Sequence, residues 1–115
     1  MEIKEEKRGE VKIIGLRGRL DVETSPSVEK RLMNVMDQGE RRLVFDFSEL
    51  TYISSSGLRV LIGVARNLHQ TNGKVALAAL SDYVHEIIKI AGFTNIFSIY
   101  PTCDEAVAHL QSDSR

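Results

Sequence analysis

Three consecutive serines followed by a glycine form the segment of this 115-residue sequence best suited to chemistry. Ser54, Ser55 and Ser56 come shortly after an apolar run and directly before a stretch with helical periodicity that opens with Gly57. The N-terminus of a helix leaves backbone N–H groups without partners, and the helix dipole favours a negative group there. Such a position suits an ordinary serine cap, and it suits equally a phosphate carried by a serine.

The elements that must position these serines follow from the hydrophobic pattern. The runs Leu43–Phe47 and Val75–Leu80 are short and continuously apolar, which predicts parallel strands buried on both faces. Two earlier apolar stretches, separated by the turn-like Arg8-Gly9, predict an initial hairpin. Ile96–Tyr100 predicts a last short strand. Amphipathic stretches of helical spacing alternate with these strands.

Capping residues predict where the other helices begin. Ser25 is placed to cap the first helix, with Pro26 in its first turn. Ser81 is placed to cap the third, and Thr102 with Glu105 has the spacing of a capping box for the last. The sequence therefore predicts a single-domain α/β fold, with a mixed, mostly parallel sheet that starts with a hairpin and about four helices covering it.

Two motifs resemble those of the STAS domain family, especially the bacterial anti-sigma-factor antagonists. From Asp46 to Leu61, Asp46-Phe47-Ser48 closes a strand and Ser54-Ser55-Ser56-Gly57-Leu58 opens a helix, which is similar to the family signature. Gly18-Arg19-Leu20-Asp21 resembles the family's Gly-x-Leu/Ile-Asp element. The order of strands and helices matches along nearly the whole chain. The resemblance implies a STAS-like domain over residues 1–111, and the terminal residues 112–115 are expected to form a flexible tail.

The resemblance also implies a phosphorylation switch at Ser55. In that family the equivalent serine is phosphorylated by an anti-sigma factor that is itself a serine-protein kinase, and a serine phosphatase reverses the modification. The unphosphorylated form binds the kinase and frees its sigma factor. Asp21 is expected to lie near Ser55. The residues expected to bind the partner are Asp21, Ser54, Ser55, Ser56, Gly57 and Arg59.

The resemblance leaves alternatives open at the same site. Many family members have an aspartate immediately before the phosphoacceptor, whereas this sequence has Ser54 there, so phosphorylation of Ser54, of Ser55 or of neither remains open. Some members keep the fold without being phosphorylated. The second hypothesis is therefore a constitutive STAS scaffold subunit of a stressosome-like or lipid-transport assembly.

Composition and motifs argue against other classes of function. A net charge of −1 gives no electrostatic footprint for nucleic acid, and no apolar run predicts a membrane span or a secretion signal, so we expect a cytoplasmic protein. Ser55 lacks the Gly-x-Ser-x-Gly elbow of a hydrolase, so we expect no enzyme activity. The three histidines have no metal-binding spacing, and we expect neither a metal nor a cofactor. Cys103, the single cysteine, is expected to be a small core residue.

Overall fold

The computed structural model describes residues 1–112, which form one sheet of six strands and four helices. The predicted fold class, a single-domain α/β fold with a mixed, mostly parallel sheet, is confirmed. In chain order the elements are β1 (Glu2–Arg8), β2 (Val11–Leu20), α1 (Ser25–Asp37), β3 (Arg42–Asp46), β4 (Leu50–Ile53), α2 (Ser55–Gln70), β5 (Lys74–Ala78), α3 (Asp82–Ile90), β6 (Ser98–Tyr100) and α4 (Cys103–Ser112).

The sheet has the strand order β1-β2-β3-β5-β6, and β4 pairs with β2. Only β1 and β2 are antiparallel, joined at the predicted bend, where Gly9 has a φ of +57°. The other pairs are parallel. β3 pairs with the Lys12–Gly15 part of β2, and β4 pairs with the Gly18–Leu20 part. β4 therefore lies beside the carboxyl end of β2, directly before α2.

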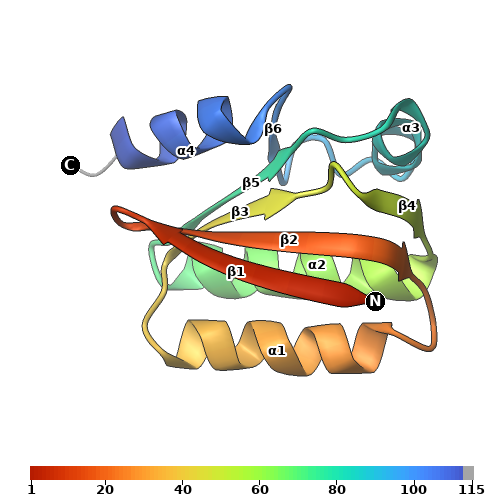
Figure 1. The fold of residues 1–115 in the computed structure, drawn as a ribbon, viewed down its shortest axis with the longest axis horizontal. Coiled ribbons are helices and arrows are strands. Elements are labelled where there is room, and N and C mark those ends of the chain that lie inside the picture. The colour runs from red at the N-terminus through yellow and green to blue at the C-terminus, as the bar shows by residue number, and fades with distance from the viewer. Residues whose placement is uncertain (113–115) are drawn as a thin grey trace.

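Helices cover both faces of the sheet (Figure 1). α1 and α2 lie side by side on one face and α4 lies on the other, while α3 packs near β4. Leu43 and Phe45 of β3 belong to the larger apolar cluster, beneath α1, α2 and α3, whereas Val44 between them belongs to a smaller cluster beneath α4. Burial on both faces explains why this strand is continuously apolar.

The start of α1 differs from the prediction. Thr24, not Ser25, occupies the N-cap position, and Ser25 is the first helical residue. Its side chain is buried, and its hydroxyl donates to the backbone oxygen of Asp21 at 2.5 Å. Ser25 does not cap the helix because the Asp21 carboxylate already accepts hydrogen bonds from the N–H groups of Glu23 and Thr24, which fixes the turn before it.

The other two predicted caps are confirmed. The hydroxyl of Ser81 accepts a hydrogen bond from the N–H of Val84 at 3.1 Å. The hydroxyl of Thr102 accepts one from the N–H of Glu105 at 3.1 Å, which is one half of a capping box.

Several strands differ from the predicted pattern: β3 ends at Asp46 rather than Phe47, and β5 ends at Ala78 rather than Leu80. The sequence predicts no strand between β3 and α2, but four residues there form β4, whose Leu50 and Ile53 are buried. A four-residue strand has no periodicity to detect, and its partner on β2 is distant in sequence. β6 begins at Ser98 rather than Ile96. At the C-terminus, α4 extends to Ser112, and the rest of the predicted 112–115 tail lies outside the described residues.

Candidate functional site

The first turn of α2 is held against the end of β2. The N–H of Ser54 donates to the backbone oxygen of Leu20 at 2.9 Å, which extends the β2–β4 pairing to the start of the helix. Gly57 is buried and packs against Leu20. A Cβ atom at Gly57 would lie 2.7 Å from Leu20 Cγ and 2.9 Å from Leu20 O. Only glycine allows this close approach without a shift in either element. The position of the three serines is therefore set by β2.

The three serines have different environments. Ser54 is the N-cap residue, and its hydroxyl accepts a hydrogen bond from the N–H of Gly57 at 3.1 Å. Ser55, the first helical residue, is exposed, and Ser56 is half-buried. Within residues 1–112, the side chain of Ser55 makes no hydrogen bond, and the first turn of α2 contains no acidic residue. The hydroxyl at this helix start that is both exposed and unbonded is therefore that of Ser55.

Asp21 directly follows Leu20, the residue whose backbone oxygen accepts the N–H of Ser54. Its carboxylate accepts hydrogen bonds from the N–H groups of Glu23 and Thr24 at 3.0 and 3.1 Å. These bonds, that of Thr24 foremost, hold the pKa of Asp21 below its ordinary value, and the nearby Arg19 guanidinium acts in the same direction. The carboxylate thus organises the β2–α1 turn, and its described contacts do not include Ser55.

A stack of side chains that was not predicted borders the same site. The Arg19 guanidinium lies over the ring of Tyr52, 4.1 Å from its centroid. The Tyr52 ring stacks in turn on Tyr83 of α3, with centroids 6.3 Å apart and an angle of 20° between the planes. Parallel pairing of β2 with β4 places Arg19 opposite Tyr52. Without β4 there was no signal in the sequence for this contact.

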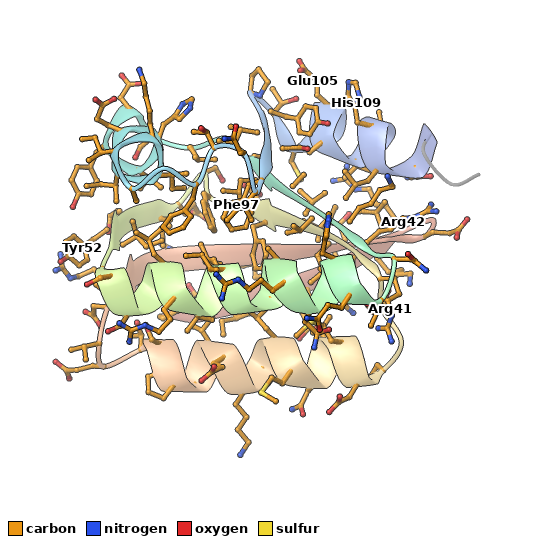
Figure 2. The ribbon with its side chains drawn as sticks, turned by 180° about the vertical axis from the view of Figure 1, so that it is seen from behind. Arg41, Arg42, Tyr52, Phe97, Glu105 and His109 are labelled. Carbon is orange, nitrogen blue, oxygen red and sulfur yellow. The ribbon has the colours of Figure 1, made fainter. Side chains whose placement is uncertain are left out.

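Arg59 is exposed, one helical turn after Ser55, and makes no ion pair within residues 1–112. The sequence also contains Arg41, Arg42 and Arg66, but the structure does not gather the four arginines. Figure 2 places Arg41 and Arg42 at the end of the molecule opposite Tyr52. Arg41 donates to the backbone oxygens of Met36 and Glu40, so its role there is structural.

The histidines, the cysteine and one cleft are the remaining features that could carry a function. His69, His85 and His109 are exposed, and the described residues contain no group of three potential metal ligands. Burial raises the pKa of the Cys103 thiol, which packs at the edge of the smaller cluster. A cleft of about 640 Å³ lies at the C-terminal half of α2, far from Ser55 along the helix. Within residues 1–112, no helix combines the length and apolarity needed to cross a bilayer.

Comparison with known proteins identifies the family. Residues 2–106 match the model described as the STAS domain, so this chain belongs to the STAS domain family and the resemblance seen in the motifs is confirmed. BtrV of Bordetella bronchiseptica, provisionally named an anti-sigma factor antagonist, is 39% identical over 93 residues, or 81% of this chain and 80% of BtrV. The anti-sigma-B factor antagonist of Listeria monocytogenes is 30% identical over 99 residues, or 86% of each chain.

Two solved structures have a similar fold. SpoIIAA of Bacillus in its phosphorylated form matches with a TM-score of 0.75 at 22% identity, covering 94% of this chain and 98% of that chain. SpoIIAA in its unphosphorylated form matches with a TM-score of 0.76 at 18% identity, covering 97% and 99%. The similarity to both forms is a similarity of fold.

Proposed function

We propose that this protein is an anti-sigma factor antagonist that acts as a phosphorylation-controlled binding switch. Its unphosphorylated form binds an anti-sigma factor that is also a serine-protein kinase, and so frees a sigma factor. Phosphorylation of Ser55 releases the kinase, and a serine phosphatase restores the binding form. The names of the Listeria and Bordetella relatives support this class of partner.

The observation that carries the proposal is the difference between Ser54 and Ser55. The Ser54 hydroxyl is half-buried and accepts the N–H of Gly57, so a kinase would have to open the helix cap to reach it. Ser55 is exposed and makes no side-chain hydrogen bond within residues 1–112. A kinase can reach the Ser55 hydroxyl without disturbing any contact of the fold, which favours Ser55 as the phosphoacceptor.

The switch requires no refolding. A phosphoryl group adds roughly 1.5 to 2 negative charges, which the N-terminus of a helix accommodates well. The same charge on a docking surface disrupts a close contact by repulsion and by the cost of desolvation. The similar match to both forms of SpoIIAA agrees with a fold that the two states of such a protein share.

The partner-binding residues divide into two groups. Ser55 and Arg59 are exposed and are proposed to contact the partner directly, with Ser54 and Ser56 at the edge of that contact. Asp21 and the buried Gly57 position the turn and the helix that present them. In this proposal the protein acts by stoichiometric binding rather than by catalysis. It does so in the cytoplasm, where sigma factors act.

Two exposed apolar side chains enlarge the same surface. Val22, next to Asp21, is 69% exposed, and Tyr83, at the end of the Arg19–Tyr52–Tyr83 stack, is 46% exposed. Aromatic side chains held by stacking lose little entropy when they are buried in an interface. We assign this surface to partner docking.

The test is phosphorylation by the cognate anti-sigma factor kinase with ATP, followed by mapping of the phosphate by mass spectrometry. Wild type and Ser54→Ala are expected to carry the phosphate on Ser55, and Ser55→Ala is expected to carry none. Phosphate on Ser54 in the wild type would contradict the assignment of the site. If the kinase adds no phosphate, and if wild type and Ser55→Asp bind the partner with equal affinity, the protein is instead a constitutive scaffold.

A further inference from the structure

Arg59 stands on the same side of α2 as Ser55. Residues four apart on an α-helix lie one above the other, so the two side chains are neighbours. Both are exposed. In the described part of the chain the Ser55 hydroxyl makes no side-chain hydrogen bond, so no such contact holds it away from Arg59.

Arg59 also lacks the kind of partner that other arginines in this protein have. Arg8, Arg17, Arg19, Arg31 and Arg42 each approach a carboxylate, and Arg41 donates to backbone oxygens. Across residues 1–112, Arg59 and Arg66 are the arginines for which no such contact is found. The Arg59 guanidinium is therefore an available cation close to the phosphoacceptor.

The order of Ser55 and Arg59 along the helix favours an ion pair after phosphorylation. An acid four residues before a base is the more favourable order for an ion pair on a helix. In the unmodified protein the residue four positions before Arg59 is the neutral Ser55, and the first turn of α2 has no acid to take its place. Phosphorylation would turn Ser55 into a dianion with three acceptor oxygens at the position where Arg59 could pair with it.

We propose that Arg59 changes its binding partner when Ser55 is phosphorylated. In the unmodified protein it binds a carboxylate on the anti-sigma factor. After phosphorylation it pairs with the phosphate four residues before it, so that the modification both adds a repelling charge and withdraws a cation from the interface. This inference rests on the proposed function for the identity of the partner, but the pairing of Arg59 with the phosphate does not depend on it.

The first experiment tests the pairing without any partner. Protein carrying phosphoserine at position 55, installed during translation, is titrated by ³¹P NMR. An adjacent guanidinium favours the dianion, so the second phosphate pKa in the wild type is expected to lie about 0.3 to 1 unit below that of Arg59→Gln. Arg59→Lys is expected to keep part of this shift, since it keeps the charge but not the two-pronged geometry.

Arg66→Gln is the matched control for this titration. Arg66 is exposed on the same helix and carries the same charge, but it lies seven residues further along, about 10 Å along the helix axis from Arg59. Its substitution is expected to leave the phosphate pKa unchanged. Equal phosphate pKa values in wild type and Arg59→Gln would overturn the pairing, as would an equal change in Arg66→Gln.

The second experiment measures binding of the anti-sigma factor to both phosphorylation states. Arg59→Gln is expected to weaken binding of the unphosphorylated form about fivefold to tenfold and to reduce the ratio between the two states by a similar factor. Unchanged affinity and ratio would overturn the role of Arg59 in the partner contact. If wild type binds the partner equally in both states, the proposed switch fails, and the NMR titration still decides whether Arg59 holds the phosphate.

Discussion

The starts of α2 and α3 are the same structure locally and differ in their surroundings. Each follows a strand, and each has a serine at the N-cap whose hydroxyl accepts a hydrogen bond from the N–H three residues later at 3.1 Å. Tyr52 of β4, the strand that leads into α2, stacks on Tyr83 in the first turn of α3. A serine cap therefore does not distinguish a candidate site from an ordinary helix end.

The differences lie at the neighbouring positions. After its cap, α2 continues with the exposed and neutral Ser55, whereas α3 continues with the acidic Asp82, which already complements the helix dipole. Three residues after the cap, α2 has Gly57 pressed against β2, whereas α3 has the buried side chain of Val84. The candidate site therefore depends on the exposed, unbonded hydroxyl beside the cap and on how closely α2 approaches β2.

The largest effect is expected when a negative charge is placed at one helix start or the other. Ser55→Asp should weaken binding of the anti-sigma factor by about 100-fold or more, or about 3 kcal/mol, because a charge in the centre of the contact is repelled and desolvated. Ser81→Asp keeps an equally good cap on α3 and should change the affinity far less. Calorimetric titration measures both, and similar losses would mean that the two helix starts do not differ in function.

The next effect concerns the glycine that brings α2 close to β2. Gly57→Ala should destabilise the protein by about 1–3 kcal/mol, because its Cβ would overlap Leu20, including a backbone atom that cannot move freely. Gly63→Ala, on the exposed side of the same helix with no atom within 4 Å of the new Cβ, should stabilise it by about 1 kcal/mol through helix propensity. Urea unfolding measures both changes. Changes of the same sign would show that close approach is not what selects Gly57.

The fold could be predicted from the sequence because its signals are local. The runs around Phe45 and Leu77 are apolar since they are covered on both faces, and the serine cap of α3 is visible from the residues alone. The three-serine segment could be placed at a helix start for the same reason. What the sequence could not supply was long-range: the pairing of β4 with β2, which brings Arg19 onto Tyr52, depends on residues more than thirty positions apart.

The incorrect prediction that Ser25 caps α1 has a different origin, because the hydrogen bonds that overturn it are local. The sequence Thr24-Ser25-Pro26 fits a cap followed by an N-terminal proline, but the pattern contains no information on what Asp21 bonds to. The carboxylate closes the turn from outside the helix, so Ser25 could be buried. A single sequence also does not tell which of three adjacent serines is exposed, because that depends on which hydroxyl receives the N–H of Gly57.

Removing the caps tests the part that the two helix starts share. Ser54→Ala and Ser81→Ala should each cost about 1 kcal/mol of folding stability, since each leaves an N–H without its acceptor. Ser55→Ala should change stability by no more than a few tenths of a kcal/mol, because its hydroxyl makes no described contact. Thermal and urea unfolding of the three variants measure this order. A loss at Ser55 as large as that at Ser54 would contradict the division of roles between the two serines.

The smallest effect is expected at Asp21, whose carboxylate holds the turn between β2 and α1. The hydrogen bonds from Thr24 and Glu23 keep its pKa below the ordinary value of 3.8, so the ionised carboxylate stabilises the fold. That contribution is fully present above about pH 4 and is lost as the pH falls through the lowered pKa. Asp21→Asn should therefore be less stable than wild type at pH 7, and the gap should narrow at pH 3. Glu23→Gln, on the same exposed loop, is the control, because it removes a charge and keeps the backbone N–H that Asp21 accepts. A gap of the same size at both pH values would mean that the charge of Asp21 does not hold the turn beside α2.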